Sequence, residues 1–419
     1  MRLVSRRQAL QTVAVTPLGV FAARAGRARD ERQVPPTPYG GGTLPAGIRS
    51  RVIPGVNGIA MHVLEAGFDP PGRPGLLLVH GFPELGYSWR KVMRPLADAG
   101  YHVMAPDQRG YGRSGGTDVA YDADLAPFST LNRVRDLLAL TSALGHRSLT
   151  AVIGHDFGSP VAAWCALTRP DVFRAVVMMS APFAGSPRLP FDTANTAARA
   201  PSPAPDMDAG LAALSPPRKH YQTYYTTREA NANMWHPPQG LQAFLRAYYH
   251  AKSADWPGNA PHPLTANTPE QFAILPRYYV MDEDKGMAEQ VAADMPTAAQ
   301  IAACRWLPDR ELAVYAAEYG RTGFQGGLQS YRVGRDARSG AELTLFAGRT
   351  IDVPAAFVSG KADWGVFQRA GSYEAMQKTA CTKFWGTRLL DGAGHWVQQE
   401  QPEALSAVLL EFLKALPTP

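Results

Sequence analysis

The chain of 419 residues is poor in cysteine and has no long apolar run. Its three cysteines, Cys165, Cys304 and Cys381, stand singly, with no Cys-x-x-Cys or Cys/His cluster nearby. An odd number of scattered cysteines is no disulfide framework and indicates no metal site. The apolar stretches fall short of the roughly twenty residues that cross a bilayer, so we predict no stable membrane insertion. There is no internal repeat, and the length is ample for a large apolar core.

Net positive charge is also small once the first residues are set aside. Residues 1–25 have a basic start with Arg6-Arg7, a short apolar stretch and the small-x-small site Ala23-Arg24-Ala25. This pattern is typical of a signal peptide, and the paired arginines resemble a twin-arginine signal, which exports folded proteins. A disordered basic tail is the alternative. Cleavage after Ala25 removes four arginines and no acid, so the net charge of +6 becomes +2. The charge therefore indicates no nucleic-acid partner, and we expect an exported protein, periplasmic or secreted.

Two blocks of alternating strand-like and helix-like stretches follow a linker over residues 26–47. Residues 48–182 contain apolar runs such as Leu76–Val79 and Leu149–Ile153, separated by helical stretches, and the alternation resumes over residues 350–419. Continuous apolar runs separated by helices predict a parallel sheet covered on both faces. We therefore predict one doubly wound, mostly parallel α/β domain that is interrupted in its middle.

The interruption, residues 183–349, has a different composition. Residues 187–217 are rich in Pro, Ala and Ser and predict an irregular loop. Aromatic residues then follow in density, from Tyr221 to Tyr279. We interpret this segment as a mostly helical cap over the carboxyl edge of the sheet, where open α/β sheets bind ligands. Many of its aromatic residues are expected to form ordinary helical core.

The most informative motif is Gly154-His155-Asp156-Phe157-Gly158. It has the Gly-x-nucleophile-x-Gly spacing of a strand-to-helix elbow, with an aspartate where esterases and lipases carry serine. Asp156 is already an anion at neutral pH, and its attack on an acyl carbon would give only a reactive anhydride. Its useful target is a saturated carbon bearing a leaving group, so the product is an alkyl ester of the enzyme that water must open. Epoxides and alkyl halides are substrates of that kind.

A base and an acid for the second step follow late in the chain. His395, in Gly394-His395-Trp396, comes after a predicted strand and is positioned to activate water as a general base. Asp363 follows the strand-like run Ala355–Val358 and is expected to orient His395 and to balance its charge. Asp352 and Asp391 are alternative acids, although both resemble turn residues.

Backbone donors for an oxyanion are predicted beside the nucleophile. His80-Gly81-Phe82-Pro83 directly follows the strand Leu76–Val79, and glycine lets the backbone turn closely there. The amides of Phe82 and Phe157 can then hold the oxyanion that forms when the ester of Asp156 becomes tetrahedral. The Phe82-Pro83 bond is a candidate cis peptide. His155 and Arg109 are expected to be structural.

The leaving group decides between the two substrate classes. Opening an epoxide generates an alkoxide, which needs phenolic donors, and the cap offers Tyr221 early and Tyr331 late. A halide is better held by N–H donors such as tryptophan or asparagine side chains. Phe157 after the nucleophile and Phe82 after His80-Gly81 have no side-chain N–H, which counts against a dehalogenase.

On these motifs, the chain resembles the epoxide hydrolases of the α/β-hydrolase fold, over about Ile48 to Lys414. The resemblance is strongest in four stretches, which are His80–Glu84, Asp107–Ser114, Gly154–Gly158 and Gly394–Trp396. The order nucleophile, acid, base is also that of α/β-hydrolases. The insertion before Tyr221 is long for the family, and an exported form departs from its intracellular members.

The resemblance implies that two cap tyrosines bind the epoxide oxygen, and by motif these are Tyr221 and Tyr331, with Tyr319 and Tyr315 in reserve for the second. It implies a small hydrophobic epoxide and water as partners, a vicinal diol as product, and no cofactor. Substrate contacts are expected from Phe82 and from two tryptophans beside the acid and the base, Trp364 and Trp396.

Three other functions compete with this one. A haloalkane or haloacid dehalogenase would use the same aspartyl ester. A non-catalytic binding protein on this scaffold is possible in principle, because a fold does not determine function, yet a binder needs neither nucleophile nor base. Esterase or lipase activity is excluded, because the elbow has no serine.

Overall fold

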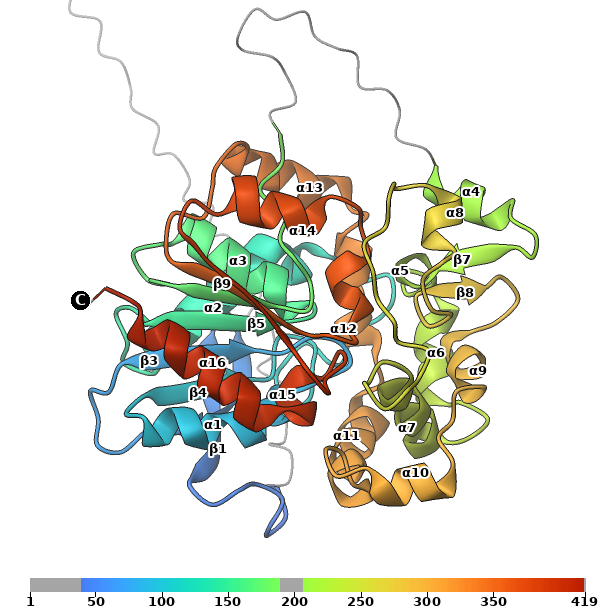
Figure 1. Ribbon diagram of the computed structural model, residues 1–419. Helices are drawn as coiled ribbons and strands as arrows, with labels where there is room; N and C mark the ends of the chain where they lie inside the picture. The colour runs from blue at the N-terminus through green and yellow to red at the C-terminus, as the bar shows by residue number, and fades with distance from the viewer. Residues whose placement is uncertain (1–38, 189–205, 418–419) are drawn as a thin grey trace, which may run out of the picture. The chain divides into compact units, whose positions relative to one another are not determined.

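The computed structural model describes residues 39–188 and 206–417, and these contain a mostly parallel eight-stranded sheet (Figure 1). The expected signal peptide, part of the linker and residues 189–205 of the Pro/Ala-rich segment lie outside the described residues. The strand order is β1-β2-β4-β3-β5-β6-β9-β10, with antiparallel pairing only at β1/β2 and β2/β4. In chain order the strands are β1 Ile48–Val56, β2 Ile59–Ala66, β3 Gly75–Val79, β4 His102–Pro106, β5 Ala151–His155, β6 Val176–Met179, β9 Ala355–Gly360 and β10 Phe384–Leu390.

Helices cover both faces of this sheet, as the continuous apolar runs predict. Helices α1 (Arg90–Asp98) and α16 (Pro402–Lys414) share one apolar cluster with one face of the sheet. Helices α2 (Thr130–Ala143) and α3 (Gly158–Thr168) share another with the opposite face. Figure 1 shows the two pairs on opposite sides of the strands. The predicted doubly wound α/β fold is confirmed.

Strand β1 is the main element of the sheet that the apolar runs did not predict. It pairs antiparallel with β2 at one edge and leaves Arg49 half-buried and Arg51 exposed. Its mostly exposed residues belong to an edge strand with one face in solvent, unlike the uninterrupted apolar runs of β3 and β5.

The cap enters after β6 and leaves before β9. Its elements are α4 Met207–Ala212, β7 Arg218–His220, α5 Tyr221–Tyr224, α6 Glu229–Trp235, α7 Leu241–Ala251, α8 Pro269–Phe272, β8 Val280–Asp282, α9 Met287–Ala292, α10 Ala298–Ala303, α11 Asp309–Thr322 and α12 Gln325–Val333. A third apolar cluster fills it and reaches down to Phe82 and Trp396. The interruption was expected to run to Arg349, but α13 (Ala337–Leu343) already returns to α2, and Leu343 and Phe346 pack on the sheet's cluster.

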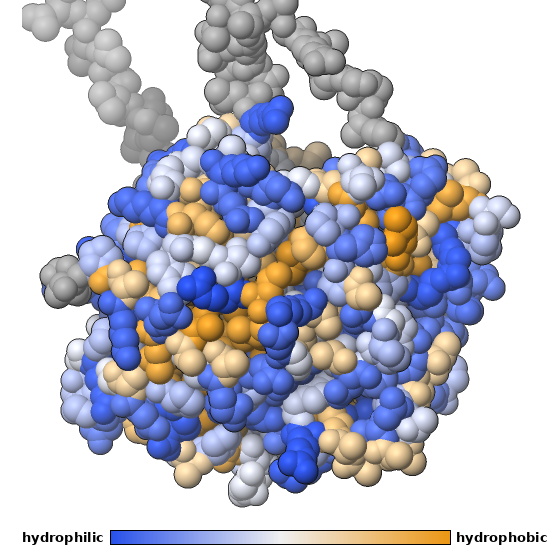
Figure 2. Space-filling view, viewed as in Figure 1, coloured by the Kyte–Doolittle hydropathy of each residue, from blue (hydrophilic) through white to orange (hydrophobic). Residues whose placement is uncertain are grey.

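Polar side chains cover most of the face in Figure 2, with an apolar band near its middle. Within residues 39–188 and 206–417, no helix combines the length and the apolar character needed to cross a membrane.

Parallel strands end at one edge, which gathers residues that lie far apart in the chain. His80 follows β3, Asp156 follows β5 and Ser180 follows β6. The segment with Asp363 follows β9, and the loop with His395 follows β10. The cap lies over this edge, so the predicted nucleophile, acid and base meet beneath it.

Gly154 tests how tightly the elbow is built. A Cβ atom there would lie 2.1 Å from the carbonyl oxygen of Gly158, which is backbone and cannot move aside alone. We therefore expect Gly154→Ala to destabilise the protein by about 2–4 kcal/mol in denaturant unfolding.

Gly340→Ala is the matched control, because Gly340 lies in α13 with nothing within 4 Å of the added Cβ. It should be neutral or stabilising by about 0.5–1 kcal/mol. Equal losses in the two variants would contradict the tight elbow.

Candidate active site

Asp156 stands on a strained turn between β5 and α3. Its φ is +50°, a left-handed conformation that is rare for a residue with a Cβ. The turn is possible because the residues packed around it are glycines, which have no side chain. A Cβ on Gly81 would lie 2.4 Å from the Cβ of Asp156, and one on Gly158 would lie 2.3 Å from the carbonyl oxygen of Val79. The glycines thus let the carboxylate project from the end of the sheet.

The carboxylate of Asp156 is held as an anion although it is nearly buried. The amide of Phe82 donates to Oδ1 at 2.9 Å, and Nε2 of His395 lies 3.4 Å from Oδ2. Burial alone would raise the pKa of Asp156, but the hydrogen bond and charge of His395, followed by the charge of Lys252, outweigh burial and hold this pKa well below its usual range. The Phe82-Pro83 peptide of the same loop is cis, as predicted.

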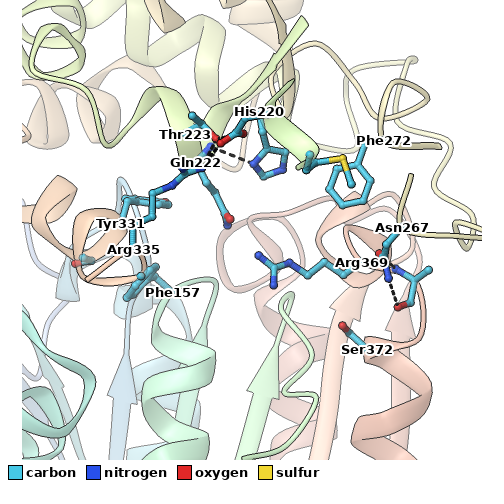
Figure 3. Close-up of a pocket in the computed structure, with 15 residues that line it drawn as sticks. Phe157, His220, Gln222, Thr223, Asn267, Phe272, Tyr331, Arg335, Arg369 and Ser372 are labelled. Carbon is cyan, nitrogen blue, oxygen red and sulfur yellow. Dashed lines mark hydrogen bonds and ion pairs between the residues drawn. The ribbon is translucent and has the colours of Figure 1, made fainter. Parts of the chain in front are cut away.

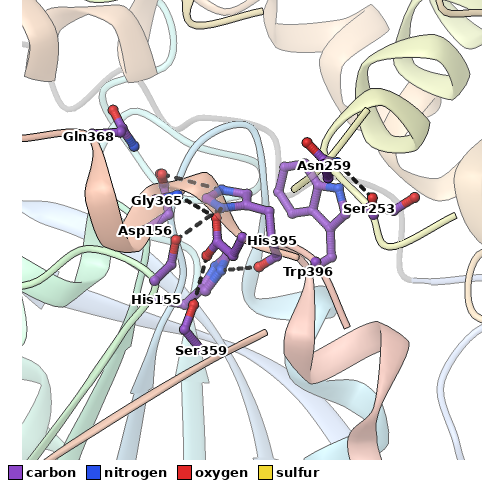
Figure 4. A network of polar contacts seen from close by, with 12 residues as sticks. His155, Asp156, Ser253, Asn259, Ser359, Gly365, Gln368, His395 and Trp396 are labelled. Carbon is purple, nitrogen blue, oxygen red and sulfur yellow. Dashed lines mark hydrogen bonds and ion pairs between the residues drawn. The ribbon is translucent and has the colours of Figure 1, made fainter. Parts of the chain in front are cut away.

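His395 lies between two carboxylates (Figure 4). Its Nδ1 lies 3.1 Å from Oδ1 of Asp363 and 2.9 Å from Oγ of Ser180, so its other nitrogen, Nε2, faces Asp156. Burial and the charge of Lys252 lower the pKa of His395, whereas Asp363 and Asp156 raise it, and the result lies above its ordinary value.

Asp363 is fixed by its own contacts below the histidine. The hydroxyl of Ser359 donates to Oδ2 at 2.8 Å, and the amide of Gly365 donates to Oδ1 at 2.7 Å. Burial opposes ionisation, but the charge and hydrogen bond of His395 lower the pKa of Asp363 to about 2. The geometry therefore favours Asp363 as the acid. Asp391 pairs with Lys361, and Asp352 accepts from Thr350 and Thr382 instead.

The loop that carries His395 is attached to the cap by one buried carboxylate. Both oxygens of Glu400 accept backbone hydrogen bonds, from Ala254 at 2.8 Å, Gly394 at 3.0 Å and Trp396 at 2.9 Å. Burial raises the pKa of Glu400 to about 8 in spite of these three donors. Glu400 thus joins the segment after α7 to both neighbours of His395.

His155 supports the same loop from below, which confirms its structural role. One ring nitrogen lies 2.8 Å from a carboxylate oxygen of Glu84, and the other donates to the carbonyl of His395 at 2.7 Å. Gln398 and Gln399 also donate to Glu84. Arg109 is structural as well, since it forms a buried ion pair with Asp136.

The two predicted tyrosines border the same cavity as Asp156. Tyr221 and Tyr331 are buried, with ring centroids 6.2 Å apart. Burial, followed by the charge of Asp156, raises the pKa of each phenol, so both remain proton donors. The hydroxyl of Tyr221 donates to Gln368 at 3.3 Å and accepts from Gln222 at 3.2 Å.

Two cavities meet at this point. The inner cavity, of about 300 Å³, is bordered by Asp156, Tyr221 and Tyr331 together with Phe157 and Gln368. An outer cavity of about 600 Å³ shares Phe157 and Tyr331 with it (Figure 3). In Figure 3, cap side chains such as His220 and Gln222 face core side chains such as Arg369 across the outer cavity.

A model of the alpha/beta hydrolase fold family matches residues 74–402 of this chain. Over 369 residues the chain is 32% identical to Epoxide hydrolase A of Mycobacterium tuberculosis (strain ATCC 25618 / H37Rv), a match that covers 86% of this chain and 96% of that protein. Epoxide Hydrolase A from Mycobacterium thermoresistibile superposes with a TM-score of 0.68 at 33% identity, over 89% of this chain and 100% of the other. The chain belongs to the epoxide hydrolases. An epoxide hydrolase from an endophytic Streptomyces also superposes, with a TM-score of 0.69 at 29% identity, over 88% of this chain and 96% of the other.

In this member of the epoxide hydrolase family, several other residues predicted for the site do not lie at the inner cavity. Tyr319 donates to the carbonyl of Glu84 and Tyr315 to the side chain of Gln399, so neither reserve tyrosine faces the nucleophile. The three expected substrate contacts, Phe82, Trp364 and Trp396, do not border the inner cavity. Trp396 instead packs on His395, with ring centroids 4.5 Å apart, and donates to the carbonyl of Tyr249. No hydrogen bond is found for the Phe157 amide among the described residues, so its oxyanion role stays a prediction.

Four residues of the site were not predicted: Ser180, Lys252, Glu84 and Glu400. Ser180 had a usable signal, because it ends a parallel strand at the ligand-binding edge. Lys252 and Glu400 had none, since a lysine or glutamate near a helix end is ordinarily a solvated residue. Within the described residues, no group of three His, Cys, Asp or Glu side chains has the arrangement of a metal site.

Glu400→Gln tests whether this carboxylate positions the base. An amide has only one oxygen, so its nitrogen would face a backbone N–H, and we expect a loss of about 1–3 kcal/mol in the free energy of unfolding. Turnover should also fall, because the loop around His395 loses its attachment to Ala254 or Trp396.

Glu403→Gln, at an exposed position in the first turn of α16, is the control and should change neither quantity. Denaturant unfolding and steady-state kinetics measure both effects. Wild-type behaviour of Glu400→Gln would rule out the positioning role.

Proposed function

We propose that this protein hydrolyses a small hydrophobic epoxide to a vicinal diol through a covalent ester on Asp156. The observation that carries the proposal is the inner cavity, which Asp156, Tyr221 and Tyr331 border together, with Nε2 of His395 3.4 Å from the carboxylate. The relatives' printed names support the same reaction. No cofactor takes part in the proposed cycle.

In the first step, a carboxylate oxygen of Asp156 attacks a ring carbon of the epoxide. The carbon–oxygen bond of the ring breaks, its electron pair stays on the ring oxygen, and Tyr221 or Tyr331 gives that oxygen a proton. Two phenols aimed at one developing charge stabilise it more in the transition state than in the bound substrate. The raised pKa values of both phenols keep them protonated until then.

In the second step, water attacks the carbonyl carbon of the ester and gives a proton to Nε2 of His395. In the free protein this nitrogen lies 3.4 Å from Oδ2 of Asp156. Once Asp156 is a neutral ester, that ion pair no longer engages Nε2, and its lone pair is available to the water. The amide of Phe82 is positioned to hold the oxyanion, and the N-terminus of α3 with the Phe157 amide adds to it. The ester bond to the diol oxygen then breaks, and that oxygen takes the proton from His395.

Neither competing function has a specific observation in its favour. A dehalogenase would need N–H donors beside the leaving group, yet Phe157, next to Asp156, has no side-chain N–H, and the relatives are named epoxide hydrolases. A binding protein would gain nothing from the strained backbone at Asp156. From the sequence of residues 1–25 we also propose export by a twin-arginine-type signal, as a periplasmic or secreted protein.

His395→Gln should separate the two steps. The variant keeps the nucleophile and lacks the base, so incubation with a styrene-oxide-like epoxide should add one substrate mass to the peptide that contains Asp156. Turnover should fall by at least about a hundredfold. Intact-mass and peptide mass spectrometry measure the adduct.

Two controls accompany this experiment. His236→Gln, at an exposed position in the cap, should turn over normally and accumulate no ester. Asp156→Asn in the His395→Gln background should form no adduct. A folded His395→Gln protein that stays unmodified, or an adduct on another peptide, contradicts the mechanism.

Replacement of Tyr221 and of Tyr331 by phenylalanine tests whether these tyrosines donate the proton to the epoxide oxygen. Tyr221→Phe and Tyr331→Phe each remove one donor from the epoxide oxygen, so the rate of ester formation should fall by about 10- to 1000-fold. Rapid-quench measurement of the ester gives this rate directly. A larger loss in Tyr319→Phe or Tyr315→Phe than in Tyr331→Phe would move the second donor away from Tyr331.

A further inference from the structure

Lys252 is a buried cation at the active site that the proposed cycle does not use. It follows α7 in the cap and is 2% exposed. No hydrogen bond joins its Nζ to any other residue within the described part of the chain. A lysine is almost never buried to this extent unless something compensates its charge.

Aromatic rings surround the Lys252 ammonium. The distances from Nζ to the ring centroids are 4.9 Å for Tyr279, 5.3 Å for Tyr248, 5.4 Å for Trp396 and 5.9 Å for Tyr278. Ring faces within about 6 Å attract a cation and stabilise it more strongly where water is excluded. Three of these rings come from the cap, and the fourth belongs to the residue after His395.

The backbone fixes Lys252 relative to the base. Its carbonyl oxygen accepts a hydrogen bond from the amide of His395 at 2.9 Å. The contact is close because Gly394 has no side chain, and a Cβ there would lie 2.6 Å from that same carbonyl. Any movement of Lys252 therefore moves the loop that carries the imidazole.

Charges of both signs face this pair. The groups that act on Lys252 are the carboxylates of Asp156, Asp363 and Glu84, which raise its pKa against the larger effect of burial, and the phenols of Tyr248, Tyr278 and Tyr279 lie around it. The groups that act on His395 are Asp156, Asp363 and Lys252, and the ring of His155 lies 4.9 Å away.

Two carboxylates beside one imidazole favour the imidazolium, which cannot accept a proton from water. Lys252 is the nearby positive charge that opposes them. Its effect matters most after Asp156 has become a neutral ester, because the imidazole must then accept a proton from water while Asp363 and the tyrosinate of the first step still favour the imidazolium.

We propose that Lys252 is a positioning residue for the second step, whose caged ammonium keeps His395 uncharged so that it accepts the proton of the attacking water. It acts through the field at His395 and does not touch the substrate. The proton balance is unchanged. Water loses a proton to Nε2, the diol oxygen recovers one from it, and Asp156, released as the acid, returns a proton to the tyrosinate of the first step.

Lys252→Met tests this role, because methionine keeps an apolar side chain in the cage and removes the charge. An uncharged base is present above its pKa and lost below it. Removal of Lys252 raises that pKa, so the acid limb of kcat should move upward by about one pH unit. At high pH, kcat should approach the wild-type value, and at neutral pH the ester should accumulate.

Two variants serve as controls. Lys252→Arg keeps the charge and should keep the limb close to the wild-type position. Lys285→Met removes a positive charge from a cap lysine whose side chain is 42% exposed, and it should leave the limb unchanged. If Lys252→Met does not fold, Lys252→Gln takes its place. An unmoved limb, or a fall in kcat that is equal at all pH values, overturns the proposal.

The inference rests on the proposed function, and the two can fail separately. NMR titration of the His395 ring in the free protein needs no turnover, and in Lys252→Met the ring should titrate at higher pH. Adduct formation in His395→Gln together with unchanged titration in Lys252→Met would refute the role of Lys252 alone. Absence of the adduct would refute the ester mechanism itself.

Discussion

The buried negative charge of Asp156 is the constraint on which the rest of the site depends. An isolated carboxylate in an apolar interior is expensive, and burial alone would neutralise it. The site stabilises the anion with the Phe82 amide, with His395 and with the charge of Lys252. Each of these contacts depends on the left-handed backbone conformation of Asp156, which needs glycines in the chain packed around it. The stabilisation of the anion therefore depends on the geometry of the elbow, and the elbow depends on the glycines around it.

Much of this arrangement could be predicted because its parts follow strands. Apolar runs marked β3, β5 and β9, and parallel strands bring their carboxyl ends together. Asp156 was therefore found from the elbow motif after β5, and Asp363 from its position after β9. Strand β1 escaped prediction because its half-buried and exposed arginines break any apolar run. A strand at a wet edge carries a weaker signal than one covered on both faces.

Residues whose contacts depend on how the cap folds back onto the core could not be predicted. Glu400 binds the amide of Ala254, a contact set by how the cap folds back and invisible in either local sequence. A second hydrogen bond of Glu400, from the amide of Trp396, explains why Trp396, expected at the substrate, packs elsewhere. The indole N–H of Trp396 donates to the carbonyl of Tyr249. These two hydrogen bonds hold the indole ring against His395. Adjacency to the base in sequence did not mean adjacency to the cavity.

The cap therefore contributes to both chemical steps through different segments. In the proposed cycle, Tyr221 and Tyr331 act on the leaving oxygen. The turn after α7 holds the loop of His395 through the carbonyl of Lys252 and the amide of Ala254. If the cap only covered the sheet, it could shift or be replaced without moving His395. Here, displacement of that turn would also displace His395, because two hydrogen bonds join them, one to the amide of His395 and one to the side chain of Glu400. Changes of substrate preference are thus easier to accommodate near Tyr221 than near Lys252, since only the first segment can be remodelled without disturbing ester hydrolysis.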